Sequence, residues 1–332
     1  MPAEEKMKFI YFTLSFLLLA TLVKAEKLTI YTYDSFVSEW GPGPIIEKQF
    51  EETYQIDLDL VAVDSAATLL NKVILEGENT KADIVLGLDM NLFDIAKESD
   101  LFDKHSLKNL NDKINLPISW ESQIFVPYNF GYFAFVYNNK NLKNPPKSMD
   151  ELINSTKARI VIQDPRTSTP GLGLLTWMKA LYGDDAKKNW SKLNKKIISV
   201  TKGWTDAYYN FFMEGEADIV FSYTSSPAAH IMFEENYDIS ASAFTEGNYI
   251  SVEFAGILKS STNKEMANKF LNFMLSEDFQ SIIPSTNIMY PVTNISLPEA
   301  FNELEIPKPL QLKPKDINEN KEEWINEWLN AS

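Results

Sequence analysis

The sequence predicts an α/β protein of two lobes, joined by crossing strands that leave a ligand cleft between the lobes. Two stretches, 28–88 and 159–223, each alternate short apolar runs typical of strands with segments of helical periodicity. Two further apolar runs, at 132–137 and 252–258, are placed so that the chain can pass between lobes in opposite directions. The length of 332 residues suits two domains. Alternating strands and helices build a mostly parallel sheet covered by helices.

The N-terminal segment 7–25, MKFIYFTLSFLLLATLVKA, has the pattern of a secretory signal peptide. Its uncharged run 9–23 would span about 22 Å as a helix, which is short for a hydrocarbon core of about 30 Å, so a membrane anchor is the weaker alternative. We expect initiation at Met7, removal of residues 1–25, and a mature chain in the periplasm. Because no cysteine follows the cleavage site, lipid anchoring through an N-terminal cysteine is excluded, and we expect a free monomer.

The composition excludes several function classes. With 31 Lys+Arg against 46 Asp+Glu, the chain carries a formal charge of −15, and removal of residues 1–25 makes it −16, which disfavours nucleic acid as a partner. No cysteine is present, and His105 and His230 are the two histidines, so thiolate and multi-histidine metal sites are excluded. Phosphate-loop, dinucleotide, serine-hydrolase and zinc-protease motifs are also missing. We expect no enzyme and no cofactor, although a carboxylate-pair hydrolase stays open.

The first series of elements begins the mature chain. Each expected strand is a short apolar run bounded by polar residues, and each expected helix has apolar residues at helical spacing. Gly77 stands where the second helix should end, a common position for glycine. We expect strands at 28–33, 58–63 and 82–88, and helices at 45–54 and 66–76.

The second series follows the first crossing strand. Ser148 and Glu151 have the spacing of a capping box, and Pro170 stands in the first turn of an expected helix. Gly183 and Gly215 mark two helix ends. We expect strands at 159–163, 197–200 and 217–223, and helices at 169–182 and 204–214.

The two crossings define the domain organisation. We expect the first lobe at residues 26–131 and 257–332 and the second at 132–256, with the helix at 264–275 and the C-terminal helix carrying Trp328 in the first lobe. Crossing strands of this kind imply a hinge and a cleft, which is the plan of bilobed binding proteins. The alternative is two independent tandem domains.

Polar residues cluster where the expected strands end, and ligands of α/β sheets bind at such ends. The segment that opens the helix at 169 offers hydroxyls and free N–H groups, which suit a phosphate, with plain N-capping as an equal alternative. The candidate binding residues in the first lobe are Tyr33, Asp34, Asp64, Ser65 and Ala66, and those in the second are Ser168, Thr169, Trp204, Tyr223, Thr224, Ser225 and Ser226.

Aromatic and acidic residues near the same ends favour a cationic ligand. Flat cationic rings stack on aromatic faces, and nearby carboxylates offset a positive charge. The alternative roles are core packing for the rings and turn formation for the carboxylates. The adjacent Tyr208 and Tyr209 could bind a ferric ion with carboxylates, with helix packing as the favoured alternative. The candidates are Tyr33, Trp40, Trp204, Tyr208 and Tyr223 among the rings, and Asp34, Asp64, Asp89 and Asp164 among the acids.

Several of these segments resemble the thiamine-binding periplasmic proteins, which are solute-binding components of ABC importers. The likeness extends from about Lys27 to Trp328, and its most specific part is QDPRTSTPGLG (163–173), in order with TKGW (201–204) and SYTSSP (222–227). Further matching segments are YTYDSFVSEWGPGP, KADIVLGLDMNL, FVPYNFGYFAFVYN and MYPV. The resemblance implies a type 2 periplasmic binding protein fold, and capture of thiamine and its mono- and diphosphate for delivery to a membrane permease.

The resemblance also implies roles for individual residues. In the family, the phosphate end is met by the hydroxyls that match Ser168 and Thr169, by the match to Trp204, and by the stretch that matches residues 223–226. The aminopyrimidine and thiazolium rings lie among aromatic residues that include the match to Tyr33.

The sequence departs from the family pattern at several ligand-contacting positions. Two ring-contacting positions that are aromatic in the family are Ala229 and Ile288 here, and an acid–glycine pair is replaced by Ser65-Ala66, with Asp64 one residue early. Trp40 or Tyr249 are candidates to supply the missing rings. A binding protein for another ligand, such as a ferric ion or another cationic heterocycle, therefore remains an alternative, as does a secreted enzyme on the same scaffold.

Overall fold

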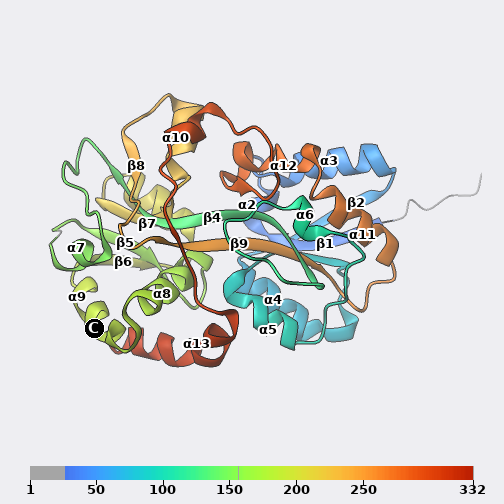
Figure 1. Cartoon of the computed structure of the whole chain (residues 1–332), viewed down its shortest axis with the longest axis horizontal. Helices are drawn as coiled ribbons and strands as arrows, with labels where there is room; N and C mark the ends of the chain where they lie inside the picture. Colours follow the sequence, from blue (N-terminus) through green and yellow to red (C-terminus); the bar gives the residue numbers. More distant parts are fainter. Residues whose placement is uncertain (1–26, 156, 332) are drawn as a thin grey trace, which may run out of the picture.

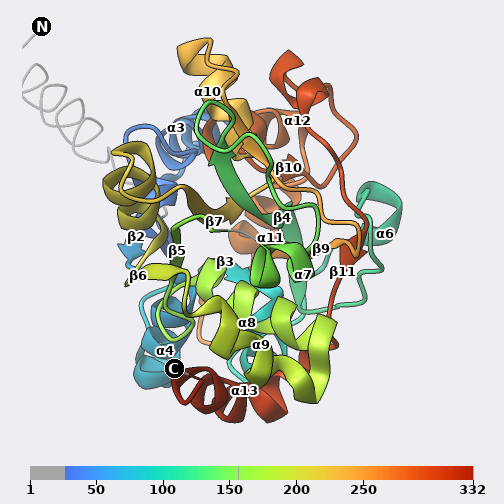
Figure 2. The same cartoon turned by 90° about the vertical axis from the view of Figure 1, so that its left-hand side faces the viewer.

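The computed structural model describes residues 27–155 and 157–331, so the predicted signal peptide lies outside the described residues. Two lobes lie side by side, and two long strands, β4 and β9, run across the middle of the molecule (Figure 1; Figure 2). The main sheet path has the order β2-β1-β3-β9-β4-β7-β5-β6. Its first three strands belong to one lobe and its last three to the other. Among the described residues, no helix is both long enough and apolar enough to cross a membrane.

The strands of the described chain are β1 (Lys27–Tyr33), β2 (Asp57–Val63), β3 (Ile84–Asp89), β4 (Phe125–Asn138), β5 (Ile160–Gln163), β6 (Ile197–Thr201), β7 (Ile219–Tyr223), β8 (Ile239–Ala241), β9 (Asn248–Ile257), β10 (Tyr290–Pro291) and β11 (Pro309–Leu310). The α-helices are α2 (Asp34–Val37), α3 (Gly43–Tyr54), α4 (Ala66–Glu76), α5 (Phe93–Glu98), α6 (Leu110–Lys113), α7 (Met149–Asn154), α8 (Thr169–Tyr182), α9 (Ala186–Leu193), α10 (Ser226–Glu234), α11 (Lys264–Phe273), α12 (Glu277–Gln280) and α13 (Pro314–Leu329). Short 3₁₀ turns lie at η1 (Gly77–Asn79), η2 (Met90–Leu92), η3 (Gly183–Asp185) and η6 (Glu299–Glu303), and π-helices lie at η4 (Asp206–Met213) and η5 (Ile283–Asn287).

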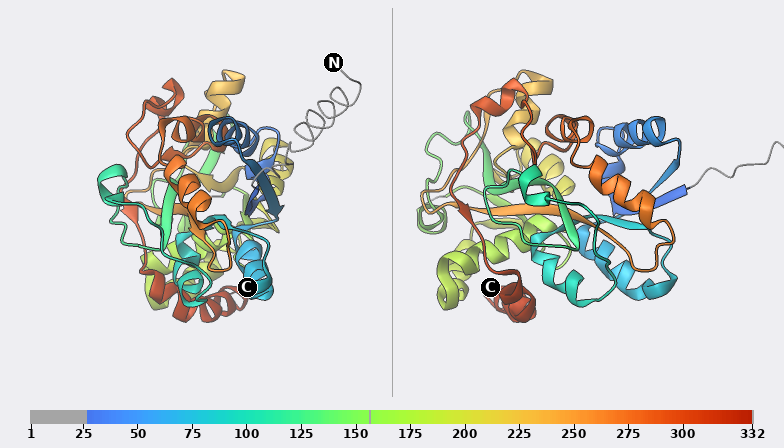
Figure 3. Two further views of the ribbon diagram at one scale, coloured as in Figure 1. Left: turned by 90° about the vertical axis from the view of Figure 1, so that its right-hand side faces the viewer. Right: turned by 45° about the vertical axis from the view of Figure 1, so that its right-hand side comes forward.

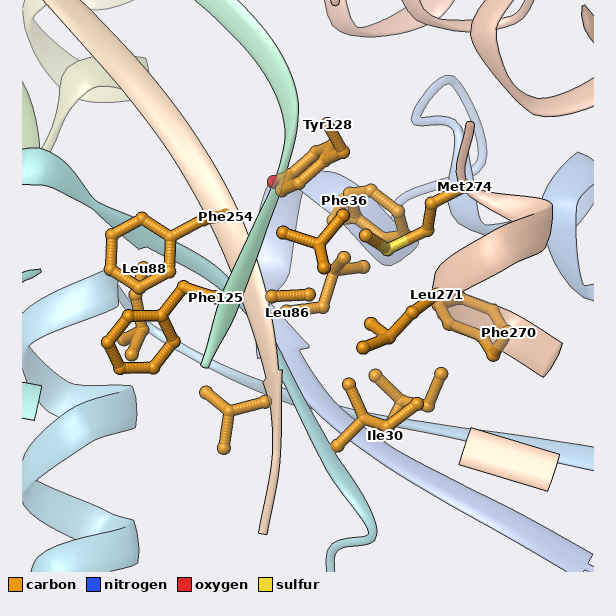
Figure 4. Packing of buried hydrophobic residues seen from close by; sticks show 14 of the residues in the cluster. Ile30, Phe36, Leu86, Leu88, Phe125, Tyr128, Phe254, Phe270, Leu271 and Met274 are labelled. Atoms are coloured by element: carbon orange, nitrogen blue, oxygen red, sulfur yellow. The ribbon is translucent and has the colours of Figure 1, made fainter. Parts of the chain in front are cut away.

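The first lobe has the predicted β-α-β-α-β order. Strands β1, β2 and β3 are parallel, so their carboxyl ends meet at one edge. Helices α3 and α11 share one face of the sheet, where the Phe50 and Phe270 rings are 5.1 Å apart, and α4 and α5 lie on the other face (Figure 1). Figure 4 shows the buried core between these layers, with Phe125 and Phe254 from the two crossing strands in contact at 4.6 Å.

The second lobe repeats the pattern with β5 parallel to both β6 and β7. Helix α8 begins and ends where the sequence predicts, with proline in its first turn and Gly183 as its C-cap. Ser148 caps α7 as expected, because its Oγ accepts from the Glu151 amide at 3.0 Å. The predicted α-helix at 204–214 is instead the π-helix η4. Its wider turn is a common feature of functional sites and carries Tyr208 and Tyr209.

The crossing strands confirm the predicted connection between the lobes. Strand β4 pairs antiparallel with β9 over its first half, up to Tyr132, and with β7 from Phe133 onward. The buried side chains divide at the same point, since Tyr132 belongs to the core of the first lobe and Phe133 to that of the second. Two antiparallel strands, both continuous through the junction, therefore hold the lobes together.

The C-terminal helix α13 contacts both lobes, whereas we expected it in the first lobe. Trp328 packs 6.4 Å from Trp190 of α9, and Glu327 pairs with Lys179 of α8 at 2.5 Å. Toward the start of the same helix, Asn318 donates to Glu98 of α5 at 2.8 Å. Figure 3 shows α13 running beneath the molecule. The lobe boundaries at 131/132 and 256/257 remain a proposal, and α13 belongs to neither lobe alone.

Candidate functional site

A cleft of ≈ 720 Å³ lies between the lobes, at the carboxyl ends of the parallel strands. The first lobe contributes the loops after β1 and β2, Gly87 of β3, and the segment 285–289. The second lobe contributes the loop before α8, the segment 202–206, and the first turns of α10. Glu253 of the crossing strand β9 lines the cleft between them.

The cleft brings the predicted binding residues together with one exception. The residues that line it are Tyr33, Asp34, Asp64, Ser65, Ala66, Ser168, Thr169, Trp204, Tyr223, Ser225 and Ser226. Thr224 does not line the cleft. It is buried and donates its backbone N–H to the Tyr132 carbonyl at 2.8 Å, which joins the loop to the crossing strand. Residues from five separate chain segments thus converge because parallel strands end at one edge.

Two helix N-termini point their free N–H groups at the cleft. Ser168 and Ser225 are the N-cap residues of α8 and α10, yet neither side chain caps its helix. The Ser225 hydroxyl is buried without a hydrogen-bond partner among the described residues, and Ser168 is also buried. Two donor hydroxyls and two helix starts favour an anion at this end of the cleft.

The hydroxyl of Thr169 is engaged in a contact between the lobes. Its Oγ1 donates to Asp89 Oδ2 at 3.0 Å, and the other Asp89 oxygen accepts from the Asn91 amide at 2.8 Å. Asp89 is buried beneath the cleft and does not line it, and this burial raises the pKa of its carboxyl group. Because a hydroxyl has one proton, Thr169 cannot also donate to a ligand in this arrangement.

Tyr33 stands at the end of β1 with its ring over Gly87. A Cβ at position 87 would lie 2.4 Å from that ring, and the φ of +103° at Gly87 also excludes most other residues. The Tyr33 hydroxyl donates to Glu253 Oε2 at 2.9 Å. Burial and the neighbouring Glu253 carboxylate raise the pKa of Tyr33 well above its usual value, so the phenol stays protonated. Glycine at 87 therefore lets an aromatic ring form part of the cleft wall.

Three stacked rings, Trp204, Tyr208 and His230, form part of the second-lobe wall of the cleft. Trp204 stacks on Tyr208 at 4.8 Å, and the Tyr208 hydroxyl is 3.0 Å from His230 Nε2. His230 Nδ1 is 2.9 Å from Glu234, and the indole N–H of Trp204 donates to Ser222 at 2.7 Å. Trp204 keeps partial exposure to the cleft while Tyr208 is buried. Both rings line the cleft, and Tyr208 is also packed among its neighbours, so both roles considered for this pair occur.

The predicted acids have different environments. Asp64 pairs with Lys202 across the cleft at 2.6 Å, and this hydrogen bond lowers the pKa of the Asp64 carboxyl group. Asp34 is exposed and lines the cleft. Asp164 lies outside the cleft, where it pairs with Arg166 at 2.5 Å. Asp34 and Asp64 can thus face a ligand, and Asp164 cannot.

The chain is similar to known proteins over most of its length. A family model described as bacterial extracellular solute-binding protein matches residues 79–321. The thiamine-binding periplasmic protein of Escherichia coli (strain K12) is 49% identical over 306 residues, which cover 92% of this chain and 93% of that protein. That of Haemophilus influenzae (strain Rd) is 38% identical over 314 residues, with 93% of each chain covered. The chain belongs to the thiamine-binding periplasmic protein family.

Solved structures agree with this assignment. A periplasmic thiamin binding protein superposes with a TM-score of 0.88 at 49% identity, covering 92% of this chain and 96% of that one. The ferric binding protein from Campylobacter jejuni superposes with a TM-score of 0.78 at 22% identity, covering 92% and 99%. The second likeness shows the shared fold alone. Both confirm the predicted periplasmic binding protein architecture.

The cleft includes both positions at which the sequence departs from the aromatic pattern that the resemblance implies. Ala229 and Ile288 line it, so the two departures seen in the sequence do face the ligand space. Trp40 lines the cleft with 55% exposure and can supply a ring, whereas Tyr249 is buried away from it and accepts from the Leu312 amide. Tyr209 and Phe233 also line the cleft and are exposed.

The alternative of a ferric-ion ligand requires a set of metal-binding side chains in the cleft. Among the described residues, no group of three or more His, Cys, Asp or Glu side chains could hold a metal ion. Of the two adjacent tyrosines, Tyr208 is buried, and its hydroxyl is already shared with His230. Burial also raises the pKa of Tyr208, which opposes the phenolate form that a metal ion requires.

Sequence reasoning missed four charged residues of the cleft, namely Lys202, Asp206, Glu234 and Glu253, and did not select the segment 285–289 as a whole. Lys202 is in the quoted TKGW motif, but nothing in the sequence shows that it reaches Asp64 of the other lobe. Glu253 is the polar position inside the apolar run VEFAGIL, and an acid within a crossing strand is the signal that was available. The segment 285–289 enters the cleft through a π-helix that no pattern indicated.

Proposed function

We propose that this chain captures thiamine and its mono- and diphosphate in the cleft and delivers them to the membrane permease of an ABC importer. The named relatives bind thiamine and align with 92–97% of the chain. The cleft volume of ≈ 720 Å³ is in the range of sites that enclose a small molecule. Export to the periplasm follows from the predicted signal peptide and from the family.

The observation that carries this proposal is that the cleft lining holds groups suited to an anion together with groups suited to a cation. One part has the starts of α8 and α10 with two free serine hydroxyls, which suit a phosphate. The lining as a whole holds five carboxylates, and Lys202 is the single lysine or arginine among the described lining residues. The five are Asp34, Asp64, Asp206, Glu234 and Glu253. Aromatic faces and carboxylates suit the thiazolium cation, and the helix starts suit the phosphate of the same ligand.

Within this proposal the binding residues are those predicted from the sequence, except Thr224 and the Thr169 hydroxyl, which is held by Asp89. Ser168 and Ser225 donate to the phosphate, while Tyr33, Trp204 and Tyr223 enclose the rings. The protein acts by binding and release as a monomer, without a cofactor or a catalytic step. The lobes close by bending β4 and β9 at the junction.

Native mass spectrometry of protein purified without unfolding, followed by thermal shift with thiamine, its two phosphates and ferric ion, tests this function. A ligand at 100 times its Kd adds about 2.7 kcal/mol of stability. We expect stabilisation by all three thiamine species and none by ferric ion. Stabilisation by ferric ion alone, or by none of the four, would reject the proposal.

The Trp204→Ala change tests the site itself. If the indole stacks on the ligand rings, calorimetry should show weaker binding of every thiamine species. The matched control is Trp324→Ala, a partly buried tryptophan on α13 outside the cleft. Unchanged affinity in Trp204→Ala would return Trp204 to a packing role.

A further inference from the structure

Glu253 occupies a special position at the junction of the lobes. It lies on β9, opposite Asp89 of β3 on one side and opposite Asn129 of β4 on the other. Its side chain is partly exposed and lines the cleft. A carboxylate thus stands on the strand that joins the lobes, where a ligand held between them would lie.

Three donors from the first lobe and the crossing strand hold one oxygen of this carboxylate. Glu253 Oε2 accepts from the Tyr128 hydroxyl at 2.5 Å, from Asn129 Nδ2 at 2.8 Å and from the Tyr33 hydroxyl at 2.9 Å. Figure 4 shows that Tyr128 stands in the packed core beside the crossing strands. Among the described residues, nothing donates to Glu253 Oε1. The carboxylate is therefore held rigidly by one oxygen while the other is free.

No cation compensates this carboxylate among the described residues. The ion pairs of that part of the chain do not include Glu253 or the neighbouring Asp89, and Lys202 is already paired with Asp64. Burial raises the pKa of Glu253, and the Asp89 carboxylate raises it further, although its three donors act in the opposite direction. Lys321 acts electrostatically on Asp89, but neither acid has an ion-pair partner among the described residues. Two acids side by side are unfavourable in a site of low dielectric, and a positively charged ligand would relieve this.

We propose that Glu253, through its free Oε1, makes the cleft select a positively charged ring over a neutral ring of the same shape. The inference rests on the proposed function and names the residue that sets its preference for a cation. Tyr33, Tyr128 and Asn129 are positioning residues for the carboxylate. Aromatic faces alone would accept flat rings of either charge, so the carboxylate supplies discrimination that stacking cannot.

The test compares two ligands by calorimetry: thiamine, and the isostere in which carbon replaces the thiazolium nitrogen, so that the ring is neutral. Glu253→Gln keeps an oxygen for the three donors and removes the charge. We expect it to weaken thiamine about tenfold or more and to leave the isostere within about twofold. The control Glu246→Gln makes the same chemical change outside the cleft, at a carboxylate that accepts from the Met149 amide at 3.0 Å, and should change neither affinity.

The outcomes separate the inference from the function. Wild-type protein that fails to bind thiamine would reject the proposed function. Wild-type protein that binds thiamine and the neutral isostere equally would overturn the inference without any variant, so the result does not depend on the folding of Glu253→Gln. An equal loss for both ligands in Glu253→Gln, with normal thermal unfolding, would make Glu253 a structural support for Tyr33. An unchanged thiamine affinity would also overturn the inference.

Discussion

Ser168→Ala should weaken thiamine diphosphate and leave thiamine nearly unchanged. Ser168 is 7% exposed, lines the cleft at the start of α8, and makes no capping hydrogen bond. Its hydroxyl is therefore free to donate to a phosphate. Loss of one hydrogen bond to a charged group corresponds to about 1.5–3 kcal/mol, or about 10- to 150-fold in affinity. Thiamine has no phosphate, so its affinity should stay within about twofold.

Thr169→Ala should behave differently, although the residue is adjacent. The Thr169 hydroxyl donates to Asp89 of the first lobe at 3.0 Å, so its removal takes a donor from a buried carboxylate and a link between the lobes. Both ligands need the lobes together, so both affinities should fall by a similar factor. Thr169→Ser keeps the hydroxyl and serves as the matched control, with affinities close to wild type. A double change of Ser168 and Thr169 would mix these two effects.

Calorimetry with thiamine and thiamine diphosphate on the three single variants separates them. Thermal unfolding without ligand checks that each variant folds. If Ser168→Ala lowered both affinities equally, Ser168 would be a structural residue of the helix start. The assignment of the phosphate end to α8 would then be wrong.

Three further predictions concern the Lys202–Asp64 pair, the Glu253 carboxylate and the packing of Gly173. Lys202→Ala should weaken the binding of all thiamine species by less than about fivefold, and the effect should be smaller at high salt, because the Lys202–Asp64 pair is exposed. A loss of affinity that does not depend on salt would contradict this. Thiamine affinity should fall as the pH is lowered from neutral into the acid range, because burial raises the pKa of Glu253 above its usual value and only the charged carboxylate attracts the permanent cation. Asp89, whose pKa burial also raises, lies opposite Glu253, while Tyr33, Tyr128 and Tyr223 stay protonated. Glu253→Gln should flatten the profile. Gly173→Ala should lower the free energy of unfolding by about 1–3 kcal/mol, because the added Cβ would lie 2.1 Å from the Phe133 ring. Chemical denaturation measures this change. In the control Gly203→Ala, the added Cβ would have nothing within 4 Å, so the loss should be much smaller.

The sequence predicts the elements best where both ends carry a signal. Helices α4 and α8 have the predicted bounds, because Ser65 caps the first, proline opens the second, and Gly77 and Gly183 end them. The π-helix η4 was predicted as an α-helix, since the two have nearly the same apolar pattern and differ in hydrogen bonding that no composition shows. The placement of α13 across both lobes depends on which surface its tryptophans meet, which local pattern does not encode.

Some residues of the candidate site could be predicted from the sequence, and others depend on the tertiary structure. Strand-end residues such as Tyr33, Asp64 and Tyr223 could be grouped from the sequence, because parallel strands bring their carboxyl ends to one edge. Glu253 could not, because its role depends on the register of β9 against β3 and β4, and the crossing strand that carries it reads as an apolar run. Asp164 was grouped with the cleft acids on its position alone, and its pairing with Arg166 two residues later removes it.

The contacts between the lobes explain why a ligand would be needed to hold them closed. Near the cleft, the polar contacts among the described residues include the exposed pair of Lys202 with Asp64 and the hydrogen bond of Thr169 with Asp89, while Ala228 of α10 packs in the first-lobe core. The contacts of α13 are more extensive and partly apolar, with Trp328 on Trp190, and no α13 residue lines the cleft. Opening at the cleft breaks these two polar contacts, whereas separation at α13 exposes buried rings. A ligand that touches both lobes shifts the equilibrium toward closure only by its extra contacts in the closed form. With Ala229 in one lobe and Ile288 in the other, those contacts depend less on stacking and more on the charges of Glu253 and the helix starts.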